Sequence, residues 1–273
     1  QPVQTSYISL PVHIPESFLA PLPDPSVIKT ERIDFGKTTL PEYKDLYAVV
    51  LDNVLSREEC DQLIHMAELS AGAHHDDGGV PNNGWRPAMI NAGMGQEILM
   101  QDYRNSDRII WDEKVLAKRV WERVLQGQGI KDYLSVLNGE SYRPVLGDRA
   151  ITKDQRWVVT EQGVNERLRF LKYGKGQFFR AHCDSAYQTL DEKQRSFYTL
   201  HLYLNDSAQG IGIPVAPLRG GATTFYSKDR KRRLDVDPKA GRVLIFQHRD
   251  LLHSGDDVVS GVKYSMRSDL MYQ

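Results

Sequence analysis

The sequence predicts an α+β protein in which helices come first and a strand-rich half follows. Two observations support this class. Amphipathic helical patterns occur before residue 130, and a series of short strand-like runs separated by Gly, Asp and Pro follows residue 145. Many short strands without intervening helices are typical of a β-sandwich or jelly roll and not of βαβ units.

The first elements can be predicted from local patterns. Residues 1–45 are rich in proline and are predicted to form an extended arm along the surface. Residues 46–55 have the composition of a strand. Ser56, followed three residues later by Glu59, has the spacing of a capping box, so we expect a helix to begin there.

The middle of the chain contains a long polar segment and a second helix. Residues 70–96 carry many Gly, Asn and Asp residues, and we expect a loop without regular structure. Residues 104–108 are expected to lie just before a helix. That helix is predicted over 112–127, where apolar residues recur at helical spacing.

The second half is predicted to contain strands throughout. The runs with strand composition are 156–160, 167–173, 177–184, 196–206, 220–227, 232–238, 242–248 and 262–272. We therefore expect a helical support over 46–145 and a jelly-roll core over 146–273, fused into a single domain.

Composition argues against several classes of function. The 273 residues carry a formal net charge of -1, which gives no support for binding nucleic acid or an anionic membrane surface. No apolar run approaches the ~20 residues needed to cross a bilayer, and no signal-peptide core is recognisable. The two cysteines, Cys60 and Cys183, do not suggest a disulfide framework. We expect a cytoplasmic protein.

The segment HRDL, residues 248–251, matches part of a protein-kinase catalytic loop. A kinase also needs a later DFG motif and an asparagine five residues after the aspartate. The sequence has no DFG, and Gly255 occupies the position of the asparagine. We reject the kinase interpretation. His248 and Asp250 are expected to end a strand and to form a turn.

A metal site is the better hypothesis for this region. His182 and Asp184 form an H-x-D pair in a predicted strand, where residues two apart face the same side. His253 is the best-placed third ligand. Two histidines and one carboxylate bind Fe(II) on one face and leave positions open for other ligands.

The last predicted strand carries an unusual polar face. Lys263, Ser265 and Arg267 alternate on one side, with apolar residues on the other. Burying that face is costly unless an anion meets it. A dicarboxylate such as 2-oxoglutarate satisfies this requirement, whereas an exposed edge strand is the simpler alternative.

Several motifs together resemble the prolyl 4-hydroxylase-like group of Fe(II)/2-oxoglutarate-dependent dioxygenases. They are the blocks LRFLKYGKGQFFRAHCD, LYLND, GGATTF, VDPKAGRVLIF and LLHSGDDVVSGVKYSMR. The group shows a tyrosine-glycine strand before H-x-D, then Y-L-N, G-G-x-T, a P-x-x-G turn, and a histidine followed ten residues later by lysine. The similarity spans roughly residues 167–272 and implies a double-stranded β-helix, which is the jelly-roll fold, with flanking N-terminal helices.

The resemblance also implies roles for individual residues. His182, Asp184 and His253 match the iron ligands of the group, and Lys263 matches the cation that binds the distal carboxylate of 2-oxoglutarate. Tyr173 and Tyr203 match tyrosines that contact this co-substrate, although both suit a structural role equally well. Ser265 and Arg267 share the face of Lys263, so either Lys263 or Arg267 is the main anchor.

The implied activity is that of a non-haem Fe(II) dioxygenase. Such an enzyme uses O2 and couples oxidative decarboxylation of 2-oxoglutarate to the oxidation of a C–H bond. The substrate is expected to be a small molecule, an amino acid or a peptidyl residue. Arg104, Arg108 and His201 are candidates for substrate contacts, while Thr199, which shares the strand face of His201, is expected to fill the core.

Two rival functions remain open from the sequence. One is a cupin-type metalloenzyme that does not use 2-oxoglutarate, in which Lys263 is dispensable. The other is a catalytically silent β-barrel binding module without affinity for iron.

Overall fold

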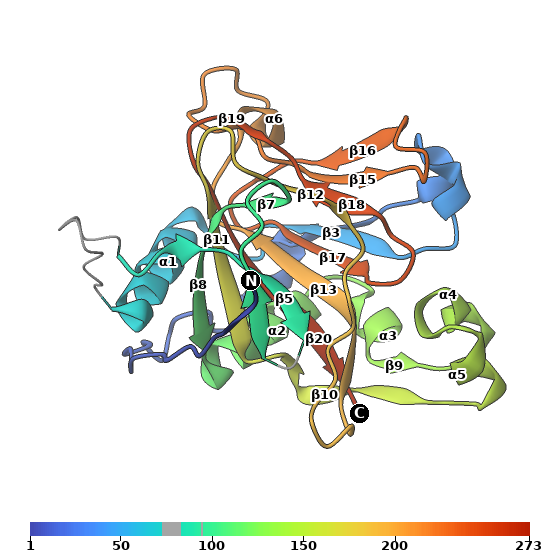
Figure 1. The fold of residues 1–273 in the computed structure, drawn as a ribbon. Helices are drawn as coiled ribbons and strands as arrows, with labels where there is room; N and C mark the ends of the chain where they lie inside the picture. The colour runs from blue at the N-terminus through green and yellow to red at the C-terminus, as the bar shows by residue number, and fades with distance from the viewer. Residues whose placement is uncertain (73–82, 94) are drawn as a thin grey trace.

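A computed structural model describes residues 1–72, 83–93 and 95–273. The protein combines mostly antiparallel sheets with a few helices (Figure 1). The longer helices are α1 (Arg57–Ala71) and α2 (Lys114–Leu125). The short ones are α3 (Ile130–Leu134), α4 (Arg143–Leu146), α5 (Asp148–Thr152) and α6 (Ala208–Ile211), with 3-10 turns at Pro25–Val27, Phe35–Lys37, Pro41–Tyr43 and Glu140–Tyr142.

A ten-stranded sheet forms the main layer. Its strands in spatial order are β2 (Lys29–Arg32), β3 (Ala48–Asp52), β17 (Val243–Gln247), β13 (Arg195–Tyr203), β20 (Lys263–Tyr272), β11 (Arg167–Tyr173), β8 (Asp107–Asp112) and β4 (Arg86–Pro87), with β10 (Trp157–Val164) joined to β20 and to β9 (Val136–Leu137). β20 pairs antiparallel with both β11 and β13, which places the polar face of this strand in the middle of the sheet.

A smaller five-stranded sheet lies across the main layer (Figure 1). Its order is β16 (Arg233–Val236), β15 (Thr223–Tyr226), β18 (His253–Gly255), β12 (Phe178–His182) and β7 (Arg104–Asn105). Two minor sheets complete the fold: β1 (Val3–Gln4), β6 (Gln96–Ile98) and β5 (Ile90–Gly93) in one, and β14 (Arg219–Gly220) with β19 (Val258–Ser260) in the other.

The helices cover one side of the main sheet. Leu63 of α1 and Val120 of α2 belong to one buried cluster with Phe170 of β11, Leu202 of β13 and Met266 of β20. Strand neighbours two apart share a face, so these residues define an outer, apolar face of the sheet. The opposite, inner face carries the polar residues of β20.

The first half contains strands that local patterns did not predict. The helix after Ser56 is present, with both hydrogen bonds of the predicted capping box. Residues 104–108, however, do not simply precede a helix, because they form β7 and the start of β8. β8 has apolar side chains on both sides, because helices cover one of its faces and the site covers the other. The alternation of apolar and polar residues that would identify a strand in the sequence is therefore missing.

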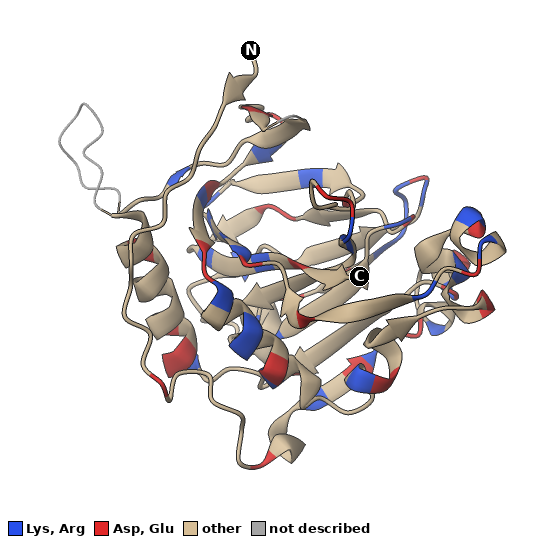
Figure 2. Ribbon diagram, turned by 90° about the horizontal axis from the view of Figure 1, so that it is seen from below, with Lys and Arg blue, Asp and Glu red and all other residues tan. Residues whose placement is uncertain are grey.

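The polar segment 70–96 is also only partly irregular. Residues 73–82 lie outside the described part of the chain, but β4 and β5 fall within the segment and pair with β8 and β6. The proline-rich arm likewise contributes β2 to the main sheet. Lys and Arg are interspersed with Asp and Glu along the elements (Figure 2). Within the described residues, no helix has the length and apolar character that a membrane span requires.

Candidate metal centre

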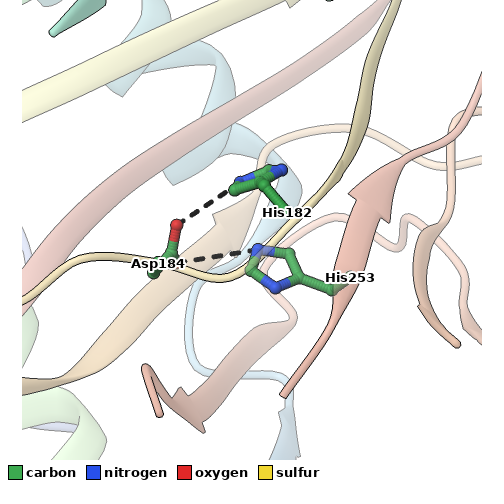
Figure 3. Close-up of side chains that lie close together, drawn as sticks. All are labelled: His182, Asp184 and His253. Atoms are coloured by element: carbon green, nitrogen blue, oxygen red, sulfur yellow. Dashed lines mark ion pairs between the residues drawn. The ribbon is translucent and has the colours of Figure 1, made fainter. Parts of the chain in front are cut away.

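Three side chains from separate segments converge between the two main sheets. His182 ends β12, Asp184 follows it by two residues, and His253 opens β18. β12 and β18 are paired with His182 opposite His253. One ligand atom from each of the three residues lies within 4.8 Å of the other two (Figure 3). Backbone pairing therefore builds the cluster from positions about seventy residues apart.

Both imidazoles are held in an orientation that suits metal binding. His182 Nδ1 lies 2.8 Å from the carbonyl oxygen of Arg180, and His253 Nδ1 lies 3.0 Å from that of Leu251. An N–H at Nδ1 donates to each carbonyl, so Nε2 keeps its lone pair. The two Nε2 atoms lie 3.4 and 3.6 Å from the Asp184 carboxylate.

Asp184 is buried and fixed by two further contacts. Arg267 Nη2 lies 3.0 Å from Oδ1, and Thr199 donates a hydrogen bond of 2.5 Å to Oδ2. Burial opposes ionisation, but Arg267 and the neighbouring imidazoles outweigh it and hold the pKa of Asp184 well below its usual range. Burial lowers the pKa of His253 to about 4, so its imidazole is neutral near pH 7. Asp184 and His253 are therefore in the ionisation states that a divalent cation requires.

Lys263 lies deep in the same layer. Its side chain is 2% exposed, and within the described residues it has no hydrogen bond or ion pair. Nζ faces the rings of Tyr173 and Tyr203, 5.2 and 5.6 Å from their centroids. Burial lowers the pKa of Lys263 to about 8. Gly221 makes room for this arrangement, because a Cβ there would lie 3.0 Å from Lys263 Cδ.

The remaining predicted co-substrate residues lie on the same inner face. Tyr203 and Ser265 are opposite each other on β13 and β20. The Tyr203 hydroxyl already donates to Thr223 Oγ1 at 2.6 Å, so it is partly satisfied by the protein. Ser265 Oγ and His201 Nε2 are buried and have no hydrogen-bond partner among the described residues. Burial and the positive charges of Lys263 and Arg267 lower the pKa of His201, which keeps it neutral.

The two arginines predicted to contact substrate have different surroundings. Arg108 forms an ion pair of 2.9 Å with Glu97 and also bonds to the Tyr7 hydroxyl. Arg104 is buried over the ring of Phe179, with its Cζ 4.7 Å from the ring centroid.

Sequence patterns missed several groups beside the centre. Asp269 lies on the same face of β20 as Lys263, Ser265 and Arg267. Extending their alternation by two residues would have predicted it. It pairs with Arg169 of β11 at 3.1 Å. Thr199, expected to fill the core, contacts Asp184 instead, because β13 brings its hydroxyl to the carboxylate. Phe179 stacks on His182 with ring centroids 3.8 Å apart.

The other histidine of the H-x-D-x-x-H segment does not join the cluster. His248 follows β17, is buried, and lies 3.6 Å from Asp269. Asp250 occupies a turn with a positive φ of 61°, as expected. His253 is therefore the residue of this segment that lies at the centre.

Comparison with known proteins agrees with this geometry. Residues 168–268 match the model of the 2OG-Fe(II) oxygenase superfamily. A search of curated proteins gives no match. Among solved structures, a Pseudomonas putida prolyl-4-hydroxylase is similar with a TM-score of 0.50 and 16% identity over 87% of this chain and 99% of that one. This likeness shows the fold.

Two further prolyl hydroxylases are similar to a lesser degree. The viral collagen prolyl hydroxylase of Paramecium Bursaria Chlorella virus-1 has a TM-score of 0.44 and 19% identity over 82% of this chain and 95% of that one. A Trichoplax adhaerens prolyl hydroxylase, solved with a peptide fragment of hypoxia inducible factor, has a TM-score of 0.46 and 13% identity over 87% of this chain and 96% of that one.

The superfamily match confirms the expected cofactors, which are Fe(II), the co-substrate 2-oxoglutarate and O2. The donor set fits that metal, because two imidazoles and one carboxylate are the ligands that hold non-haem Fe(II) while leaving coordination positions open. Over residues 168–268 this chain matches the 2OG-Fe(II) oxygenase superfamily, and its fold is similar to that of the Pseudomonas putida prolyl-4-hydroxylase.

Proposed function

We propose that this protein is a 2-oxoglutarate-dependent dioxygenase of the hydroxylase type. His182, Asp184 and His253 hold Fe(II), and Lys263 binds the distal carboxylate of 2-oxoglutarate. When bound, the metal and its co-substrate supply the oxidation of a C–H bond with release of succinate and CO2. The substrate is a peptidyl residue or a small molecule, such as an amino acid.

One observation carries the proposal. Three ligand atoms converge within 4.8 Å, and the same layer holds a buried lysine without an anionic partner in the described residues. A metal site alone does not require that lysine. A buried ammonium is costly unless a ligand compensates it, and a carboxylate is the ordinary partner.

The surrounding residues have supporting roles in this proposal. The carbonyl groups of Arg180 and Leu251 orient the imidazoles, and Thr199 and Arg267 orient the Asp184 carboxylate. Such contacts raise metal affinity by keeping each ligand in its binding orientation. Burial of the cluster excludes bulk water from the reacting centre.

An anaerobic titration tests the proposal. Adding Fe(II) and 2-oxoglutarate to the full chain is expected to produce a weak visible band near ~500 nm, which reports chelation by the keto acid at a site with open positions. His182→Ala removes one ligand and is expected to abolish the band. His13→Ala, which changes an exposed histidine, serves as the matched control and keeps it.

The rival functions give other outcomes. A cupin-type enzyme that does not use 2-oxoglutarate binds Fe(II) without producing the band, and a silent binding module binds neither. Formation of the band in the wild type and its persistence in His182→Ala would contradict the ligand assignment.

A further inference from the structure

Four arginine guanidinium groups gather on the inner side of the two sheets. They belong to Arg104 of β7, Arg108 of β8, Arg169 of β11 and Arg267 of β20. Burial first, and then the charges of the other three arginines, lower the pKa of Arg104 to about 10. The group is still protonated near pH 7, so the site contains several positive charges at short range.

Three of these arginines have a carboxylate partner. Arg108 pairs with Glu97 at 2.9 Å, and Arg169 pairs with Asp269 at 3.1 Å. Arg267 lies 3.0 Å from Asp184 and 3.6 Å from Asp269.

Arg104 differs from them. It is 8% exposed, and no carboxylate or other hydrogen-bond acceptor contacts its guanidinium group in residues 1–72, 83–93 and 95–273. Within these same ranges, its Nε is buried without a hydrogen-bond partner. A buried guanidinium without acceptors lowers the stability of the fold unless a ligand supplies the missing hydrogen bonds.

The position of Arg104 connects it to the metal centre. β7 pairs with β12 so that Arg104 lies opposite Phe179. The guanidinium carbon is 4.7 Å from the centroid of the Phe179 ring, and that ring stacks on His182 at 3.8 Å. Arg104 is thus one aromatic ring away from a proposed iron ligand.

The proposed cofactors do not neutralise this cluster. In the proposed function Asp184 is a ligand of iron. Among the described residues, Glu97 and Asp269 are then the carboxylates that remain to balance the charges of the arginines. In the proposed function one carboxylate of 2-oxoglutarate binds iron and the other binds Lys263. A further negative group is therefore required beside Arg104.

We infer that Arg104 is the binding site for a carboxylate of the primary substrate. This inference rests on the proposed function and defines its substrate class: an acid whose carboxylate meets Arg104 while its reacting C–H bond lies near the metal. A planar guanidinium suits this role because it presents two parallel N–H donors to a carboxylate.

Ligand-observed NMR tests the inference without knowledge of the substrate. The full chain is loaded with Zn(II), as a diamagnetic substitute for Fe(II), and with 2-oxoglutarate, and is titrated with benzoate or with the neutral isostere benzamide. Saturation-transfer signals give both dissociation constants. Wild type is expected to prefer benzoate by about tenfold, as a charge-assisted contact requires.

Variants separate a binding role from a structural one. Arg104→Gln is expected to lose the preference for benzoate, and Arg104→Lys is expected to keep part of it. Arg195→Gln is the matched control, because Arg195 also lies over a phenylalanine ring, at 5.6 Å from the Phe197 centroid, but is exposed. The affinity for 2-oxoglutarate is measured in parallel and is expected to change less than about twofold in Arg104→Gln.

Each other outcome overturns the inference. A carboxylate site at Arg104 is excluded if wild type binds benzoate and benzamide equally, or if Arg104→Gln keeps the preference for benzoate. It is also excluded if wild type binds neither compound at about 20-fold excess over 2-oxoglutarate, a concentration at which a weak subsite should still be occupied. Weaker binding of 2-oxoglutarate in Arg104→Gln assigns Arg104 to the co-substrate. Failure of wild type to bind 2-oxoglutarate at all contradicts the proposed function instead.

Discussion

The two faces of the ten-stranded sheet are made by the same strands and have opposite chemistry. On the outer face, Phe170 and Met266 pack against the helices in one apolar cluster. On the inner face, Lys263, Arg267 and Asp269 alternate along β20 with residues of the outer face such as Met266. The outer face stabilises the fold by burying apolar area, whereas the inner face buries charges that destabilise it until ligands bind.

This contrast means that stability and binding should respond to different substitutions. A change on the outer face is expected to alter the free energy of unfolding with little effect on ligand affinity. A change on the inner face is expected to do the reverse. The following predictions test that separation, beginning with the largest effect.

Phe170→Ala is expected to cause the largest loss of stability. The side chain is fully buried and contacts Trp111, with ring centroids 6.3 Å apart. Truncation leaves a cavity and should lower the free energy of unfolding by about 3–5 kcal/mol. Urea denaturation measures this change, with the half-exposed Val115→Ala as control. A loss below ~1 kcal/mol would show that the outer face is not the main source of stability.

Lys263→Met is expected to weaken binding of 2-oxoglutarate by about 100-fold, because it removes a charge-assisted contact of the distal carboxylate. The affinity for Fe(II) should not change. Stability should stay the same or rise, since a buried charge that has no ion pair within the described part of the chain is replaced by an apolar group of similar length. Anaerobic titration and urea denaturation give these values, and the exposed Lys228→Met is the control. A large loss of stability would assign Lys263 to the fold and not to the co-substrate.

The same lysine predicts opposite pH effects on stability and on binding. Its pKa is about 8 in the folded protein, below the ordinary value of 10.5. Between these values the unfolded chain binds more protons than the folded one, so the ligand-free protein should become more stable as pH rises. Co-substrate affinity needs the protonated form and should fall by about tenfold from pH 7 to 9. In Lys263→Met both trends should weaken, and their persistence would point to another group.

Thr199→Val tests a smaller contribution to the metal centre. The hydroxyl donates to Asp184 Oδ2 at 2.5 Å, and valine keeps the shape without the donor. Affinity for Fe(II) should fall by about tenfold. Thr152→Val, which changes an exposed threonine of α5, should leave it unchanged. Equal metal affinity in both variants would make Thr199 a packing residue only.

Much of the molecule could be predicted from local patterns. The longer strands of the second half occur where the composition predicted them, but β18, which carries His253, and β19 were not predicted. The predicted capping box at Ser56 and Glu59 begins the first helix. Alternation along 262–272 correctly separated Lys263 and Arg267 from the apolar residues of that strand. These features depend on residues that are two to four positions apart, so they can be read from the order of residues along the chain.

Contacts between distant residues were decided by the tertiary structure. Nothing in the sequence states that Arg267 meets Asp184, that Thr199 donates to the same carboxylate, or that Arg104 has no carboxylate partner in the part of the chain that the structure describes. These relations follow from the register of β13, β20 and β12 and from the way the two sheets face each other. Which residues alternate on each strand follows from their order along the chain. Only the packed sheets determined which charges meet, because electrostatic partners in a buried layer are set by distance in space.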